Sequence, residues 1–352
     1  MLRMIIGSQL SPMWSMFLIL SALLISYIVT GYISRLLIAV QKKHAVSVPI
    51  KIELAAHQLT KSGTPTFGGI AFIVGTTVVV LLLGDLTQPY TWIPVVSLWL
   101  FGLVGFLDDY AKKRSSDGIT TRQKIALQLI ASVIVMFLIT TYSGMHSTLI
   151  TLPWDPSRSL SIGAWYQIAA IVYILYFINA VNISDGLDGL AAGTGFPVLM
   201  LFGVVATLFG LGFGSSVIQQ VIGASSLHLA LVISAFLGAL LAFLWFNSKP
   251  AQVFMGDSGS HALGSLIAVS ALLLKIELVA LVASGVFLVE FLTSLLQIFA
   301  IRLKGRKLFR IAPIHHMYEQ NGLAENKIVS RFRILGILCV ILASLFFSFK
   351  YL

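Results

Sequence analysis

Residues 227–246 read LHLALVISAFLGALLAFLWF, twenty positions without an Asp, Glu, Lys or Arg. An α-helix needs about 20 mostly apolar residues to cross the hydrocarbon core of a bilayer. The whole chain fits that setting, because 58% of its 352 residues are hydrophobic and only 10% are charged, whereas a soluble domain carries about 25% charged residues. The stretch therefore predicts a membrane-spanning helix, and the composition excludes soluble folds.

Nine further apolar runs resemble this one. They are continuous rather than alternating, which excludes a membrane β-barrel, and the first is too long for a cleaved signal peptide. The sequence predicts an all-α polytopic membrane protein with about ten transmembrane helices, forming one domain over residues 1–352. The nine runs are Met13–Val40, Phe67–Gly84, Thr91–Leu107, Ile125–Tyr142, Ala164–Ala180, Leu190–Phe213, Ala262–Leu274, Leu278–Ala300 and Phe332–Phe349.

Two loops invite a more detailed prediction. Because Ala262–Leu274 is short, part of Gly256–Ser260 is expected at membrane depth as non-helical backbone, which needs a cover of protein or water. Ser143–Gly163 contains two β-prone stretches, Thr148–Leu152 and Ser159–Ile162, and these predict a small external hairpin.

Basic residues indicate the orientation of the chain. If the loops between the ten predicted helices are numbered in chain order, most Lys and Arg residues lie in the odd-numbered loops. The positive-inside rule therefore places those loops in the cytoplasm and both termini outside. The net charge of +10 suits an inner face that meets anionic lipid and an anionic substrate. A nucleic-acid partner is disfavoured, because the charge is spread over membrane loops rather than gathered on one binding domain.

The acidic residues number only 13, and three groups of them lie at the cytoplasmic ends of helices. Carboxylates at such depth are costly and usually functional. The first group is Asp108 and Asp109 with Lys112. On a helix Asp108 and Lys112 share a face, and the alternative interpretation is an ordinary charge pair at the interface.

The second group is Asn179, Asn182, Asp185 and Asp188. Their three-residue spacing predicts that they follow one side of a helical turn. The glycines between them leave room for a ligand to approach the backbone. The alternative is a helix N-cap with packing glycines.

The third group follows residue 246 and contains Asn247, Phe254 and Asp257. Asp257 lies beside glycine and serine, which suits Mg²⁺, because that ion takes hard oxygen ligands and bridges protein carboxylates to substrate phosphates. The alternative is a tight turn that caps the next helix.

Other polar residues extend this pattern. His315 and His316 lack the i, i+4 spacing of a helical zinc site and are expected to contact phosphate or a base edge, unless they are solvated surface. Residues 61–69 suit an anion cradle of backbone N–H groups or an ordinary turn. Glu290 lies inside an apolar run, shares a helix face with Gln297, and is expected to face the bundle interior.

Five motifs together resemble the phospho-N-acetylmuramoyl-pentapeptide transferase family, within the polyprenyl-phosphate sugar-1-phosphate transferase superfamily. The family pattern has a third consecutive histidine where this chain has Met317. The motifs are KSGTPTFGG (61–69), DDYAK (108–112), NAVNISDGLDGLA (179–191), FNSKPA (246–251) with FMGDSGS (254–260), and PIHHMYE (313–319).

The resemblance implies a Mg²⁺-dependent enzyme of the bacterial inner membrane with its active site facing the cytoplasm. Its substrates would be UDP-MurNAc-pentapeptide and undecaprenyl phosphate, its products lipid I and UMP, and its assembly a homodimer in the lipid bilayer. Asp257 and Asp185 would hold the metal. The implied catalytic residues are Asp108, Asp109, Lys112, Asp257, His315 and His316. The implied substrate-binding residues are Lys61, Thr66, Lys124, Asn179, Asn182, Asp185, Asp188, Asn247, Phe254 and Gln297.

Three other functions fit parts of the sequence. A transferase of the same superfamily could use UDP-GlcNAc instead. A transporter would place acids near mid-membrane and contain an inverted repeat, but only Glu290 lies deep in a run and no repeat is evident. A structural scaffold would not need several acids on one face.

Overall fold

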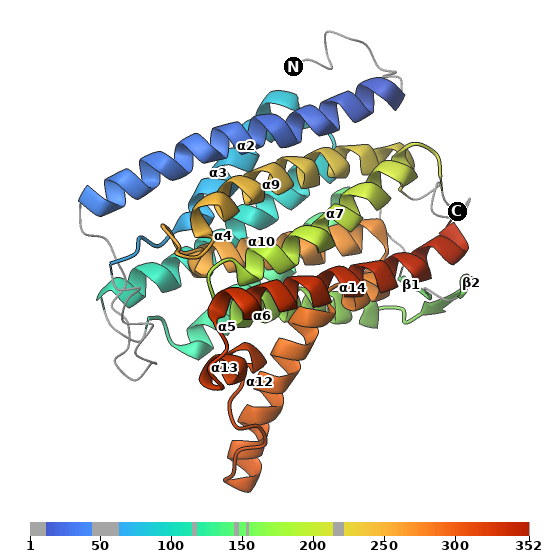
Figure 1. Cartoon of the computed structure of the whole chain (residues 1–352). Coiled ribbons are helices and arrows are strands. Elements are labelled where there is room, and N and C mark those ends of the chain that lie inside the picture. Colours follow the sequence, from blue (N-terminus) through green and yellow to red (C-terminus); the bar gives the residue numbers. More distant parts are fainter. Residues whose placement is uncertain are drawn as a thin grey trace.

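The computed structural model describes residues 12–43, 63–114, 118–143, 148–152, 155–213 and 222–351. In these ranges the chain is a bundle of helices with one small hairpin (Figure 1). The elements are α2 (Pro12–Lys43), α3 (Gly68–Leu83), α4 (Pro89–Arg114), α5 (Thr121–Tyr142), β1 (Leu149–Leu152), β2 (Asp155–Ser161), α6 (Trp165–Ser184), α7 (Leu190–Gly210), the 3₁₀ turn η2 (Gly223–Ser225), α9 (Ser226–Asn247), α10 (Gly256–Leu274), α11 (Glu277–Ala283), α12 (Gly285–Lys304), α13 (Ile314–Gln320) and α14 (Glu325–Tyr351).

The prediction of an all-α polytopic membrane protein is confirmed. Within the described residues, nine helices are long and apolar enough to cross a membrane, and α3 adds a shorter apolar helix. The predicted hairpin is also confirmed: β1 and β2 pair antiparallel, with Leu149 opposite Ser161 and Thr151 opposite Ser159.

Helix α10 is the centre of the bundle, and every residue from Ser258 to Leu274 is buried. Its neighbours approach closely at glycines. A side chain on Gly105 of α4 would collide with the backbone of Asp257, and one on Gly69 of α3 would collide with Gly259. Small residues let membrane helices pack backbone to backbone, so these contacts fix the depth of Asp257 relative to α4.

Helix α2 shows the opposite pattern. Leu20, Leu24 and Ile28 form an exposed apolar row, whereas Ser26 and Thr30 are fully buried. In a bilayer the apolar row faces lipid. The small polar face packs inward, where a side chain on Gly75 of α3 would collide with Thr30.

Two sequence predictions about helix boundaries were wrong. Gly256–Ser260 is not irregular backbone but the first turn of α10, because Asp109 supplies acceptors for the free N–H groups there. The run Leu278–Ala300 is not one helix: it breaks at Ser284 into α11 and α12. Figure 1 shows α12 leaning away from the bundle and carrying α13 beside it.

Candidate active site

Two carboxylates and two lysines meet at the end of α4. Lys112 Nζ lies 2.9 Å from Asp108 Oδ2 and 2.9 Å from Asp257 Oδ2. Lys124 Nζ lies 3.1 Å from Asp108 Oδ2 and also bonds Asp257 Oδ2. Helices α4, α5 and α10 therefore place four charged groups in contact, although they span almost 150 positions of sequence. The prediction that Asp108 and Lys112 share a helix face is confirmed.

The site has one sealed side and one open side. The side chain of Asp108 is 4% exposed, whereas those of Asp257 and Lys112 are 16% and 31% exposed. Asp108 Oδ1 also accepts the N–H of Ile119 at 3.1 Å. The accessible groups are thus the Asp257 carboxylate and the lysine ammonium groups, which suits a ligand that carries its own negative charge.

Asp109 has a different position from Asp108. Its two oxygens accept the backbone N–H groups of Asp257 and Ser258, each at 3.1 Å. These are orphan donors of the first turn of α10, so Asp109 caps that helix from a neighbouring one. A side chain on Gly256, whose φ is +73°, would collide with Asp109 and crowd Thr66.

Amides support the carboxylate of Asp257 from α6. Asn182 Nδ2 donates to Asp257 Oδ1 and to Ser260 Oγ, each at 2.9 Å. One turn earlier, Asn179 and Gln128 exchange amide hydrogen bonds, and Gln128 Nε2 lies 3.1 Å from His261 Nε2. Asn179 therefore acts through Gln128, whereas Asn182 contacts Asp257 directly.

The prediction that Asn179, Asn182, Asp185 and Asp188 follow one side of a helix was wrong for Asp188. Helix α6 ends at Ser184 with Asp185 as its C-cap, since the glycine-rich sequence beyond does not continue the helix. Asp185 is half-buried. Asp188 lies in the following turn, where Oδ2 accepts the N–H of Ala251.

Asp188 and Asn247 connect loops to one another. The N–H of Asp188 donates to Glu325 Oε1 at 2.8 Å, and Glu325 Oε2 pairs with Lys249 at 2.7 Å. Asn247 accepts the N–H of Gly189 and donates to the carbonyl of Val253. These bonds hold the α6–α7 turn against the α9–α10 loop and the start of α14.

The loop before α3 pairs with the loop before α10. Phe254 donates its N–H to the Pro65 carbonyl and accepts from Gly68 through its own carbonyl. Thr66 is buried and the Phe254 side chain is half-buried. Lys61 lies outside the described residues, so its predicted role in an anion cradle stays a prediction.

Helices α12 and α13 carry the remaining predicted residues, which are Gln297, His315 and His316. Gln297 donates to the Phe309 carbonyl and accepts the N–H groups of Leu308 and Phe309, so its amide holds the segment before α13. His315 is fully buried and bonds Glu290. A side chain on Gly186 would collide with the His315 ring, which places His315 against the turn that follows Asp185.

His316 is partly exposed beside its neighbour. Its Nδ1 lies 2.9 Å from Glu319 Oε2. Burial lowers the pKa of His316 below its ordinary value, while Glu319 and Glu290 oppose that shift. His316 therefore favours the neutral form at neutral pH.

In the part of the chain that the structure describes, no group of three or more His, Cys, Asp and Glu side chains converges to hold a metal by itself. Asp257 nevertheless presents a carboxylate that bonds Asn182 of α6, and Asp185, three residues further on, caps the same helix with a second carboxylate. Mg²⁺ usually takes one or two protein carboxylates and completes its shell with water and substrate phosphates. The donor set therefore fits Mg²⁺ that arrives with a diphosphate.

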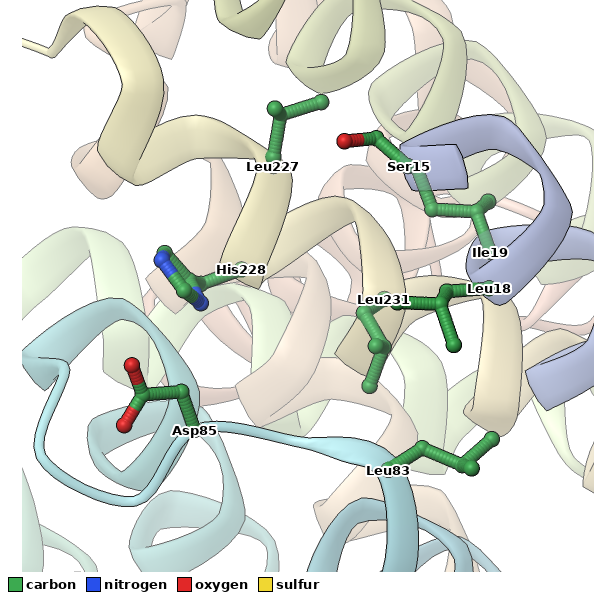
Figure 2. A pocket seen from close by; sticks show the side chains of 8 residues that line it. All are labelled: Ser15, Leu18, Ile19, Leu83, Asp85, Leu227, His228 and Leu231. Carbon is green, nitrogen blue, oxygen red and sulfur yellow. The ribbon is translucent and has the colours of Figure 1, made fainter. Parts of the chain in front are cut away.

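A cavity at the other end of α9 has no comparable chemistry. Figure 2 shows Asp85 and His228 on one side of it and Leu18, Leu83 and Leu231 on the other. Asp85 Oδ1 already accepts from the Thr87 N–H and hydroxyl in its own turn. This cavity is therefore not the candidate active site.

Sequence reasoning missed several supporting residues. Gln128 is four residues after Lys124, so helical spacing could have linked the two. Ser260 and His261 follow Asp257 in the first turns of α10, where the same reasoning applies. Glu325 lies far from every motif and contacts Asp188 only through the fold.

Comparisons with known proteins identify relatives of this chain. Residues 91–275 match the family model described as Glycosyl transferase family 4. The chain is 37% identical over 296 residues to the phospho-N-acetylmuramoyl-pentapeptide-transferase of Rickettsia canadensis, covering 82% of this chain and 81% of that protein. It is 36% identical over 326 residues to the proteins of the same name from Rickettsia massiliae and Rickettsia felis, covering 91% of this chain and 89% of each relative.

Proposed function

The chain belongs to the phospho-N-acetylmuramoyl-pentapeptide transferase family, and from that premise we propose how its charged cluster carries out the reaction. The enzyme transfers phospho-MurNAc-pentapeptide from UDP-MurNAc-pentapeptide to a membrane lipid phosphate, giving lipid I and UMP. The observation that carries the mechanism is the contact of Asp108 and Asp257 with Lys112 and Lys124. We take undecaprenyl phosphate as the acceptor, as the family resemblance implies.

The main physical problem is repulsion between two anionic substrates. In phosphoryl transfer, catalysis depends mostly on positioning and charge stabilisation. Lys112 and Lys124 supply two positive charges, and their ion pairs with Asp108 and Asp257 hold them at the same point. A diphosphate that displaces a carboxylate from these ion pairs would contact both ammonium groups. The cluster is therefore arranged to bind a diphosphate.

Mg²⁺ is the proposed cofactor, held by Asp257 with Asp185 as a second carboxylate. When bound it would neutralise charge on the diphosphate and orient it. Asn182 bonds Oδ1 of Asp257, whereas both lysines contact Oδ2.

We propose direct attack by the lipid phosphate. One of its oxygens forms a bond to the sugar-side phosphorus, and the bond from that phosphorus to the UMP oxygen breaks, with UMP leaving as the anion. The second pKa of a phosphomonoester is about 6, so the attacking group is mostly ionised already. Asp108 has both oxygens engaged, one by Ile119 and the other by two lysines, which suits an orienting role better than a nucleophilic one.

Other predicted residues have supporting roles in this proposal. Asp109 positions Asp257 by capping α10, and Asp188 with Asn247 holds the two loops that border the cluster. Thr66 and Phe254 border the start of α10, where Phe254 would stack on uracil. Gln297 shapes the segment before α13, and His315 and His316 face the sugar or phosphate. Lys61 would add positive charge.

We further propose that the cluster faces the cytoplasm of a bacterial inner membrane and that the enzyme is a homodimer. The distribution of Lys and Arg residues supports the orientation. Labelling of single cysteines from each side of sealed vesicles, in a Cys339→Ser background, tests it. Native mass spectrometry of the detergent-extracted protein tests the dimer, and a purely monomeric protein would contradict it.

One assay tests the function. Purified enzyme, radiolabelled UDP-MurNAc-pentapeptide and undecaprenyl phosphate should give label in an extractable lipid and one UMP per lipid formed, and chelation of Mg²⁺ should stop the reaction. A parallel assay with radiolabelled UDP-GlcNAc should give no lipid. Transfer from UDP-GlcNAc alone would refute the substrate assignment, and isolation of a phosphorylated enzyme during turnover would refute direct attack.

A further inference from the structure

A carboxylate inside α12 holds His315 through both of its oxygens. Glu290 Oε1 accepts the backbone N–H of His315 at 3.2 Å, and Oε2 lies 3.1 Å from its Nδ1. Both residues have 0% of their surface exposed. A carboxylate in a membrane helix is costly unless it is bonded. Here both oxygens are directed to a single residue of the PIHH motif.

This contact determines which nitrogen of the His315 ring carries the proton. An ionised Glu290 can only accept, so Nδ1 must donate to it. In the neutral ring Nε2 then keeps a free lone pair. Carboxylates that bond one ring nitrogen commonly fix the tautomer and the ring orientation in this way.

The other nitrogen is left without a partner. His315 Nε2 is buried and has no hydrogen bond within the described residues. The neighbouring His316 ring packs against His315, with centroids 4.2 Å apart, but this contact does not satisfy Nε2. Buried ring nitrogens normally have a partner, so this nitrogen is open to a partner from outside the described chain.

The unpartnered nitrogen points at a specific part of the site. A side chain on Gly186 would collide with Nε2, so the ring nitrogen packs directly against the backbone of this glycine. Gly186 directly follows Asp185 in the α6–α7 turn, and α6 also carries Asn182, which bonds Asp257. Nε2 therefore lies against the α6–α7 turn that begins at Asp185, the proposed second metal ligand.

Resting on the proposed function, we propose that Glu290 is a positioning residue of the transferase. It holds His315 as the Nδ1–H tautomer, so that the Nε2 lone pair accepts a hydrogen bond from a hydroxyl of the bound nucleotide sugar. Glu290 itself does not touch the substrate. Gly186 is the matching feature of the turn, because any larger residue would collide with the His315 ring.

The test uses the isosteric substitution Glu290→Gln in the full-length enzyme. Gln can still accept the backbone N–H, but its NH₂ group faces Nδ1 and favours the Nε2–H tautomer. We expect kcat/KM for UDP-MurNAc-pentapeptide to fall about 30- to 100-fold. Glu290→Asp keeps the charge and should recover part of that loss. Glu277→Gln removes another buried carboxylate, at the far end of the bundle, and should leave kcat/KM per folded molecule within about twofold.

The ¹⁵N shifts of the His315 ring give a readout that a purely structural role would not change. The chain has seven histidines, and the His315 signals are those lost in His315→Asn. We expect a protonated Nδ1 and an unprotonated Nε2 in the wild type, and the reverse in Glu290→Gln.

Two results would overturn the inference: a wild-type ring with its proton on Nε2, or a Glu290→Gln enzyme with kcat/KM within twofold of wild type. If Glu290→Gln does not fold, the wild-type tautomer and the Glu290→Asp kinetics decide. Failure of the wild-type enzyme to label lipid would refute the proposed function instead, and the ring shifts would still decide the tautomer.

Discussion

Ion pairs occur at both ends of this bundle, and they are built differently. At the proposed cytoplasmic end, Lys124 and Lys112 join Asp108 of α4 to Asp257 of α10. At the other end, Lys275 and Glu277 are two residues apart and pair at 3.3 Å, and Glu277 accepts the Tyr166 hydroxyl at 2.6 Å.

The difference lies in exposure and in the distance between the partners along the chain. The Lys275 and Glu277 side chains are 7% and 8% exposed and form a closed local pair, with the Lys275 ammonium 3.9 Å from the centre of the Tyr166 ring. The other cluster joins three helices and keeps an open edge. A closed local pair is explained by packing, whereas an open cluster assembled from distant segments needs a ligand to explain it. Substitutions at the two ends should therefore affect different measurements.

Asp257→Asn should have the largest effect. The amide keeps the shape but loses the charge that holds both lysines and the proposed Mg²⁺, so UMP release should fall at least about 1000-fold. The thermal unfolding temperature should change little. Initial-rate measurement of UMP, with circular dichroism as the folding control, checks this. Near-normal turnover would remove Asp257 as the metal ligand.

Lys124→Met and Lys275→Met test the comparison directly. Lys124→Met should lower turnover roughly 100-fold through the loss of one charge on the diphosphate, with modest effect on stability. Lys275→Met should keep turnover per folded molecule but destabilise the protein by about 3 kcal/mol, because it leaves the Glu277 carboxylate buried without its cation. Equal effects of the two variants on turnover would contradict the assignment of roles to the two ends.

Asp109→Asn should have a smaller effect. The amide retains only one acceptor for the two N–H groups at the start of α10, so stability should fall by about 1 kcal/mol and turnover by less than about tenfold. Asp85→Asn, in an exposed turn on the opposite end of α3, is the control for loss of a side-chain cap. A loss of turnover as large as that of Asp257→Asn would show that Asp109 acts on substrate.

The smallest effect should be the pH dependence due to His316. Since burial lowers the pKa of His316 in the folded protein, the unfolded chain binds the proton more tightly. The stability from this residue is therefore present above its ordinary pKa of about 6.5 and is lost as the pH falls through the folded-state pKa. Unfolding temperatures at pH 7.5 and 5.5 should differ less in His316→Gln than in wild type, by under about 2 °C. An unchanged difference would contradict the prediction.

The sequence was sufficient to predict that the protein spans a membrane, that it contains a hairpin, and which acidic residues form groups. Apolar runs of about 20 residues can only be satisfied in a bilayer by helices, and a polar residue in such a run is visible without any structure. Helical spacing also predicted the Asp108–Lys112 contact. These features depend on residues near one another in the chain, so local rules describe them.

The tertiary structure decided which contacts each acidic residue makes. Asp108 and Asp109 are adjacent in sequence, yet one joins the lysine cluster and the other caps α10, because successive residues on α4 point to different neighbours. Asp188 and Asp185 separate for a related reason: α6 ends at Ser184, so Asp185 caps the helix and Asp188 lies in the turn beyond it. Glu290 of α12 contacts His315 of α13, on the far side of the loop that joins these two helices. Such pairings depend on how helices pack at glycines such as Gly105 and Gly69, and no spacing within a single segment encodes them.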